Sequence, residues 1–286
     1  MDQRIIDLYD DFTHRHLDRR LFLERLAKLV GSTAAALALL PQLQSNYALA
    51  QTVPETDPRL TTEDVSYSGS QEPVKGYVAR PASSAQAPGV VVIHENRGVH
   101  PHIKDVARRA AIAGYVALAP DLMSAVGGTP ATEDEARTKF AQIREAPVTL
   151  ADALKSVDYL RGRPDATGKI GVVGFCWGGG MVGQMAASGA DVNAAVVFYG
   201  PAPALDKVPA IRAPLLLNYA GNDGFVNPTV PPFEAALKAA GKTYTLYMYE
   251  GAQHGFHNDT AGARYDAAAA KLAWARTMEF FDRMLR

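Results

Sequence analysis

The sequence predicts a single α/β domain with a mostly parallel central sheet and helices on both faces. Short apolar segments rich in Val, Ile and Leu alternate with longer segments of helical periodicity. One apolar segment, residues 89–94, contains the unbroken β-branched run Val90-Val91-Val92-Ile93, as expected for a parallel strand buried on both faces. Strands and helices that alternate at this spacing form parallel sheets with right-handed crossovers. No internal repeat or change of composition indicates a second domain.

Charge and cysteine content exclude several classes of protein. The formal net charge is -1 over 286 residues, and no dense basic run follows the first thirty residues, so nothing favours nucleic-acid binding. The single cysteine, Cys176, rules out an intrachain disulfide. The fold therefore depends on its hydrophobic core, and Cys176 is the one thiol available for chemistry.

Residues 1–50 have the pattern of a twin-arginine export signal. Arg19 and Arg20 precede Leu21-Phe22-Leu23, and an apolar stretch follows from Leu26 to Leu40. This stretch is shorter than the roughly 20 residues of a membrane-spanning helix. In Ala48-Leu49-Ala50, which follows, the two alanines are the small residues that signal cleavage requires. We expect the folded protein to use the twin-arginine machinery and to be periplasmic or secreted. The alternative is a cytoplasmic protein whose N-terminal helix is retained and packs on the body or on a partner.

The remaining elements follow in chain order. Residues 51–61 form a polar linker with two prolines, and the domain is expected over 62–286. Residues 63–67 and 74–79 alternate between apolar and polar and predict an antiparallel hairpin at the sheet edge. Further strands are predicted at 89–94, 115–119, 169–175, 194–198, 214–219 and 244–249. Helices are predicted at 103–113, 132–144, 148–160, from 177 onward, 233–240 and 265–285.

Residues 169–181 contain the pattern Gly-x-Cys-x-Gly between a strand and a helix. This is the nucleophile elbow of the α/β-hydrolase fold, with Cys176 in place of the usual serine. The sharp turn strains the nucleophile's backbone, and glycines on either side let the strand and helix pass closely. The helix N-terminus favours a thiolate at this position. The alternative is a structural cysteine buried in a glycine-rich turn.

An acid and a histidine follow the elbow in the chain order of α/β-hydrolases. Asp223 lies after the strand at 214–219, and His254 lies after the strand at 244–249. His254 can take the proton of Cys176 or pair with its thiolate, and Asp223 would orient the imidazole. The sequence leaves open that Asp223 only shapes an Asx turn, and that His257 or Asp259 takes one of these roles. His100 and His102 lack further ligands at metal-binding spacing, so no metal site is predicted.

The chain resembles the dienelactone hydrolase family from about Val65 to the C-terminus. The resemblance is carried by residues 94–98, 113–122 and 174–179, together with Asp223 and residues 254–256. It implies a triad of Cys176, Asp223 and His254, and an oxyanion hole made by the backbone N–H groups of Trp177 and Asn96. It also implies that Glu95 contacts the resting Cys176 and controls its ionisation. The alternative for Glu95 is an ion pair with Arg97.

This resemblance implies a hydrolase that cleaves carboxylic esters or lactones through a thioester acyl-enzyme, without a cofactor. Founding members that open chlorocatechol-derived lactones hold the substrate carboxylate with arginines, one of them shortly after the catalytic histidine. Residues 254–259 contain no arginine, so we predict a general small-molecule ester or lactone as substrate. The alternatives are thioesterase, amidase or phosphotriesterase activity at the same site, or a non-catalytic exported binding protein. The natural substrate and the oligomeric state stay open.

Overall fold

The chain folds around an eight-stranded sheet with the order β1-β2-β4-β3-β5-β6-β7-β8. The computed structural model describes residues 1–14, 17–46, 52–82 and 86–286; the predicted cleavage residues 48–50 lie outside these ranges. The strands are β1 (Leu60–Tyr67), β2 (Val74–Pro81), β3 (Ala87–Ile93), β4 (Val116–Asp121), β5 (Ala166–Phe175), β6 (Ala194–Phe198), β7 (Leu215–Asn222) and β8 (Tyr244–Gln253). Pairing from β4 to β8 is parallel, and β1 and β2 form the predicted antiparallel hairpin at the edge.

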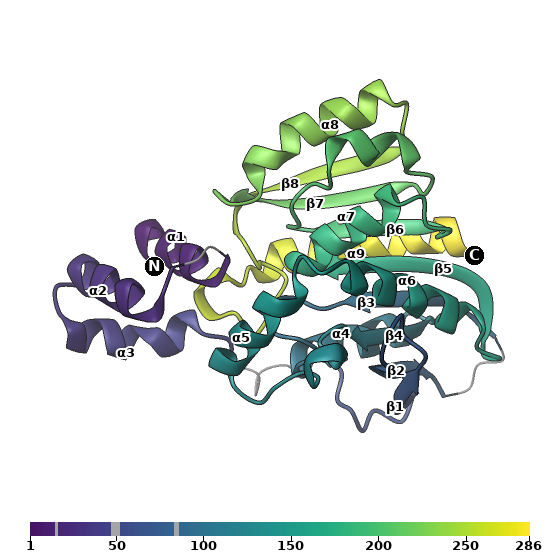
Figure 1. The fold of residues 1–286 in the computed structure, drawn as a ribbon, viewed down its shortest axis with the longest axis horizontal. Coiled ribbons are helices and arrows are strands. Elements are labelled where there is room, and N and C mark those ends of the chain that lie inside the picture. Colours follow the sequence, from purple (N-terminus) through teal and green to yellow (C-terminus); the bar gives the residue numbers. More distant parts are fainter. Residues whose placement is uncertain (15–16, 47–51, 83–85) are drawn as a thin grey trace.

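Helices cover both faces of this sheet (Figure 1). Helices α6 (Pro147–Arg161), α7 (Trp177–Ala187) and α8 (Val230–Ala239) pack on one face and share its apolar core. Helices α4 (Pro101–Ile112) and α9 (Ala267–Leu285) pack on the other. Helix α5 (Glu133–Ile143) lies in the excursion after β4. The predicted fold class, a mostly parallel sheet with helices on both faces, is confirmed.

Several strands are longer than the sequence pattern indicated, and at β7 and β8 the difference bears on the site. The predicted strand at 214–219 continues to Asn222, and the predicted strand at 244–249 continues to Gln253. A register irregularity between Ala220 and Asn222 brings Asn222 opposite Gln253. Asp223 and His254, which directly follow these two paired residues, therefore lie next to each other at the ends of two neighbouring parallel strands.

The described residues at the N-terminus form a helical layer, here called the N-terminal cap and defined as residues 1–14 and 17–46. It contains α1 (Gln3–His14), α2 (Arg19–Val30) and α3 (Thr33–Leu43). These helices share a small core of their own, centred on Tyr9, Phe12, Phe22 and Leu26. Figure 1 shows them to one side of the sheet, beside the loops that follow the central strands. The segment with the export-signal pattern thus packs on the body.

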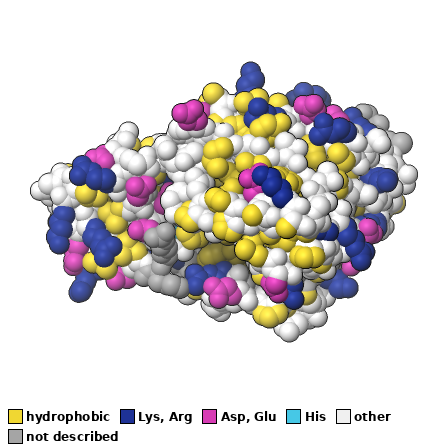
Figure 2. Space-filling view, turned by 90° about the horizontal axis from the view of Figure 1, so that it is seen from above, with side chains coloured by type: hydrophobic (Ala, Val, Ile, Leu, Met, Phe, Trp, Pro, Cys, Tyr) yellow, Lys and Arg dark blue, Asp and Glu magenta, His cyan; other side chains and the backbone are white. Residues whose placement is uncertain are grey.

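Among the described residues, no single helix has the length and apolar composition that a membrane crossing requires. Helices α2 and α3 meet the requirement only when taken together, and they are bent by 107° at their junction. In the space-filling view, acidic and basic side chains are interspersed over the cap and the body (Figure 2).

Candidate active site

Cys176 lies at the turn between β5 and α7, as the elbow pattern predicts. Its φ of 56° lies in the left-handed region, which is costly for a residue with a side chain. Its N–H donates to the Phe198 carbonyl at 3.0 Å, which holds the turn against β6. A Cβ at Gly174 would collide with the Gly178 carbonyl, and a Cβ at Gly178 would collide with the His94 carbonyl. The two glycines are therefore required for strand and helix to pass.

Asp223 and His254 form a buried hydrogen-bonded pair beyond β7 and β8. The Nδ1 atom of His254 lies 2.7 Å from Asp223 Oδ2, and both side chains are almost completely buried. The other carboxylate oxygen, Oδ1, accepts the backbone N–H groups of Phe225 and Val226 at 3.1 and 2.9 Å. The Asx-turn interpretation and the acid interpretation of Asp223 are thus compatible, because each uses a different oxygen.

The pair is arranged to hold opposite charges. Burial opposes the imidazolium, but the negative charges of Asp223 and of a Cys176 thiolate outweigh it and raise the pKa of His254 well above its ordinary value. Burial likewise opposes the carboxylate, but the charge and hydrogen bond of His254 hold the pKa of Asp223 below its ordinary value. The geometry therefore favours an imidazolium next to the sulfur.

The residues expected around Cys176 can be placed from the cavity that it borders and from its position in the chain. Glu95 and Asn96 line the same small cavity as Cys176 and His254. Trp177 is the first residue of α7 and directly follows the nucleophile. Glu95 accepts a hydrogen bond from Asn258 Nδ2 at 2.8 Å and lies 3.9 Å from His100 Nε2. Arg97 forms an ion pair with Glu133 at 3.6 Å.

The competing residues serve the structure elsewhere. His257 is buried between Phe175 and Phe198, whose ring centroids each lie 5.0 Å away, and burial lowers its pKa well below the ordinary value. Asp259 accepts from His102 Nδ1 at 2.8 Å and from Arg109. These contacts support the loop after β8. His102, considered from the sequence as a metal ligand, is here a hydrogen-bond partner of the Asp259 carboxylate.

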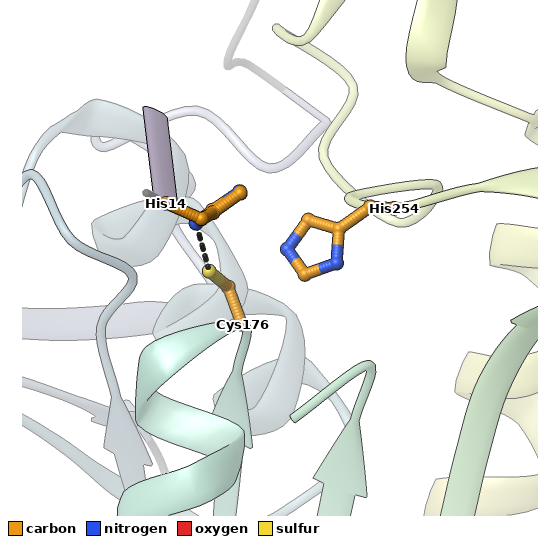
Figure 3. A group of neighbouring side chains, drawn as sticks. All are labelled: His14, Cys176 and His254. Atoms are coloured by element: carbon orange, nitrogen blue, oxygen red, sulfur yellow. Dashed lines mark hydrogen bonds between the residues drawn. The ribbon is translucent and has the colours of Figure 1, made fainter. Parts of the chain in front are cut away.

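A third side chain, which the sequence did not suggest, reaches the nucleophile from the N-terminal cap. The last residue of α1, His14, places its Nδ1 3.7 Å from Cys176 Sγ (Figure 3). Its ring lies edge-to-face with the ring of His254, with 4.5 Å between centroids. No local pattern could have indicated this contact, because it joins residues 162 positions apart.

Several contacts hold α1 over the site. Asn96 Nδ2 donates to the Thr13 carbonyl at 3.2 Å, and Arg137 lies over the Phe12 ring at 3.8 Å. The Arg264 guanidinium lies 3.7 Å from the Asp10 carboxylate. Burial raises the pKa of Asp10 to about 6, although the charge of Arg264 opposes this rise. The cap is thus joined to the body by cation–π, hydrogen-bond and ion-pair contacts.

The cap leaves little room at the sulfur. The cavity shared by Cys176, His254, His14 and Glu95 has a volume of only about 20 Å³. This volume holds a particle of the size of water but no ester, so a substrate needs α1 or the His14 side chain to move. A larger cavity of about 430 Å³ borders His14 on the other side, between α1 and α5. Arg137 and Arg144, which the sequence alone could not place, both line it.

The family model described as the dienelactone hydrolase family matches residues 74–285. The chain belongs to the dienelactone hydrolase family. A relative from Methylorubrum extorquens, provisionally named a carboxymethylenebutenolidase, is 32% identical over 282 residues and covers 93% of this chain and 95% of its own. The predicted family is confirmed, and membership makes this protein a hydrolase that acts on ester bonds.

Solved structures agree with the dienelactone hydrolase assignment. One from Klebsiella pneumoniae, provisionally named a dienelactone hydrolase, has 29% identity and a TM-score of 0.71 over 78% of this chain and 99% of that one. A dienelactone hydrolase-like promiscuous phosphotriesterase from metagenomic libraries shares the fold at 24% identity, with a TM-score of 0.73 over 80% of this chain and 100% of that one. In both comparisons about four-fifths of this chain aligns with nearly the whole of the other structure.

Proposed function

We propose that this dienelactone hydrolase family member cleaves carboxylic esters or lactones through a triad of Cys176, His254 and Asp223. The observation that carries the proposal is the buried His254–Asp223 pair at 2.7 Å beside a cysteine on a strained elbow. The raised pKa of His254 supports an imidazolium that stabilises the Cys176 thiolate. The enzyme is then ready for nucleophilic attack without a metal or an organic cofactor.

The reaction follows in two stages. The Cys176 thiolate attacks the carbonyl carbon, and the oxyanion of the tetrahedral intermediate is stabilised by the backbone N–H groups of Trp177 and Asn96. The carbon–oxygen bond breaks, and His254 gives its proton to the leaving alkoxide, which leaves a thioester on Cys176. Water then attacks the thioester while His254 accepts its proton, and the thiolate is expelled with release of the carboxylic acid. Asp223 keeps the imidazole oriented throughout.

The substrate is a general small ester or lactone in this proposal. The four arginines beside the larger cavity have partners. Arg19 pairs with Asp134 at 2.7 Å, Arg97 with Glu133 at 3.6 Å and Arg144 with Glu145 at 3.3 Å, and Arg137 donates to the Leu17 carbonyl at 3.2 Å. Residues 254–259 also lack the arginine that founding members use for a substrate carboxylate. These contacts give no reason to assign a dienelactone in particular.

Trapping the acyl-enzyme tests the triad. After brief incubation with a panel of activated esters, lactones, thioesters, amides and phosphotriesters, the protein is quenched in acid and its peptides are weighed by mass spectrometry. We expect the acyl mass of the ester or lactone on the peptide that contains Cys176, and its release by neutral hydroxylamine. Turnover of the panel with no modification of Cys176 would contradict the thioester mechanism.

We also propose that residues 1–50 direct export to the periplasm. Arg20 is 90% exposed and Arg19 is 53% exposed, so both are accessible to a receptor while the protein is folded. Cell fractionation tests this: we expect the native protein in the periplasm with a mass that begins near residue 51. The Arg19→Lys, Arg20→Lys double variant should stay in the cytoplasm at full length. Full-length native protein in the cytoplasm would instead support the retained-helix alternative.

A further inference from the structure

The cap brings a third metal-ligating side chain to the nucleophile. Cys176 Sγ and one ring nitrogen each of His14 and His254 all lie within 4.8 Å of one another. Figure 3 shows the sulfur and the two histidine side chains gathered at one point between the cap and the body. We propose that these three groups form an inhibitory binding site for a zinc ion, in the chain that retains its N-terminal cap. The site assigns to His14 a role as ligand, and it is distinct from any cofactor requirement of the hydrolase.

The spacing of two of the ligands fits a tetrahedral zinc ion. With about 2.3 Å for a zinc–sulfur bond and about 2.0–2.1 Å for a zinc–nitrogen bond, tetrahedral angles separate the two ligand atoms by about 3.6 Å. The distance from Cys176 Sγ to His14 Nδ1 is 3.7 Å. The ion therefore fits between them with little movement. One thiolate and two imidazoles are ligands that zinc prefers over magnesium or calcium.

The third ligand already has the support that metal-bound histidines usually have. His254 Nδ1 bonds to Asp223 at 2.7 Å, which leaves Nε2 for the metal. Nε2 is buried and has no hydrogen-bond partner among the described residues. A carboxylate that accepts from the other ring nitrogen orients such a histidine and makes it a stronger ligand. The Asp223–His254 pair can thus serve zinc as well as it serves catalysis.

The surrounding cavity suits an ion rather than an organic ligand. Its volume is about 20 Å³, and its lining includes Glu95, Arg97 and Arg264 as well as the three ligands. The two guanidinium groups are paired with the carboxylates of Glu133 and Asp10, at 3.6 and 3.7 Å. A fourth coordination position can be taken by water, as in zinc sites with three protein ligands. Glu95 supplies a negative charge near the cation, which reduces the cost of burying it.

Binding is balanced by release of a proton. The Cys176–His254 pair holds one proton, which lies on His254 Nε2 when the sulfur is a thiolate. This proton goes to solvent as the nitrogen–hydrogen bond breaks and the zinc–nitrogen and zinc–sulfur bonds form. No electrons are transferred. Bound zinc coordinates both Cys176 Sγ and His254 Nε2, so neither atom can take part in ester hydrolysis. Through His14 it also links α1 to the body. Inhibition of ester hydrolysis rests on the proposed function, whereas binding of the metal does not.

Metal binding is therefore measured first, on the full chain and without substrate. Zinc chloride is titrated against a chromophoric chelator, and cobalt(II) is used as a spectroscopic substitute. We expect one ion per chain with a dissociation constant in the micromolar range or below, and a thiolate-to-cobalt charge-transfer band. We also expect zinc to slow hydrogen exchange in α1, because His14 becomes a ligand.

The decisive variant is His14→Gln, with Thr13→Ala as its matched control from the same helix end and the same cavity. Loss of an outer-shell partner costs 10–100-fold in metal affinity, so loss of a ligand should raise the zinc dissociation constant at least about 10-fold. Thr13→Ala should bind zinc as the native chain does. The protection of α1 by zinc should be absent in His14→Gln, which simple weakening of cap packing would not explain.

Three results would overturn the proposal: no stoichiometric binding, binding that leaves exchange in α1 unchanged, or equal zinc affinity in His14→Gln. Each is separable from a failure of the proposed function. If the chain binds zinc but forms no acyl-enzyme, the metal site is supported and the catalytic triad is contradicted. If an acyl-enzyme forms on Cys176 but the chain binds no zinc, the triad is supported and the metal site is contradicted.

Discussion

Replacing Cys176 with alanine is expected to lower kcat/KM for a short activated ester by at least about 10⁴-fold, as found when a catalytic nucleophile is removed. The reason is that no other thiol exists in the chain to form the acyl-enzyme. Alanine is smaller than cysteine and leaves the elbow contacts intact, so the variant should remain folded. Initial rates, together with a melting curve of the same preparation, check this prediction.

Cys176→Ser is the companion variant. It keeps a nucleophilic atom at the elbow, but a serine hydroxyl is a much weaker acid than a thiol and does not ionise next to the imidazolium. We expect activity far below that of the native enzyme. Near-native rates in either variant, with unchanged folding, would mean that the sulfur is not the nucleophile.

The second large effect is expected for Asp223→Asn, with a loss of about 10²–10⁴-fold in kcat. The side-chain amide oxygen can still accept the N–H groups of Phe225 and Val226, which the present Oδ1 accepts at 3.1 and 2.9 Å. The NH₂ group then faces His254 Nδ1, and it cannot accept a proton from that nitrogen. The imidazole is thereby held in the wrong tautomer, and the imidazolium loses its counter-charge.

Asp223→Asn is also expected to shift the pH dependence of kcat/KM in a defined direction. In the native enzyme the negative charge of Asp223 helps to raise the pKa of His254, so the imidazolium persists through neutral pH and is lost only as pH rises through that raised value. Without this charge the pKa of His254 falls, and the imidazolium is lost at lower pH. The alkaline limb of the kcat/KM profile should move to lower pH in Asp223→Asn.

Asp259→Asn is the matched control for this experiment. Asp259 is a carboxylate in the same C-terminal region, but its partners are His102 at 2.8 Å and Arg109. The substitution should lower thermal stability and leave the alkaline limb where it is. A profile that moves in Asp259→Asn but not in Asp223→Asn would transfer the role of the acid to Asp259.

Much of the fold outside the N-terminal cap could be predicted because the patterns that encode it are local. The β-branched run before residue 94 and the glycines on either side of Cys176 each specify the structure of only a few neighbouring residues. The glycines are needed because the elbow brings strand and helix backbones into contact, which any Cβ would prevent. The chain order of nucleophile, acid and histidine then placed three groups at strand ends that a parallel sheet brings together.

The sequence predicted that Asp223 pairs with His254, but it did not predict where the two strands that carry them end or how these strands are aligned. The sequence pattern ended both strands several residues early, and the longer strands with their register irregularity put the two residues side by side. Such a register depends on cross-strand contacts, which periodicity along a single strand does not contain.

The sequence by itself determined the family fold, the elbow and the identity of the one available thiol, because short-range patterns of apolar residues and glycines encode them. Only the tertiary structure decided what lies over the sulfur. The contact between His14 and Cys176 depends on how three N-terminal helices pack against loops from distant strands. Residue spacing along the chain carries no signal for such packing, because shape and burial across the folded body determine it.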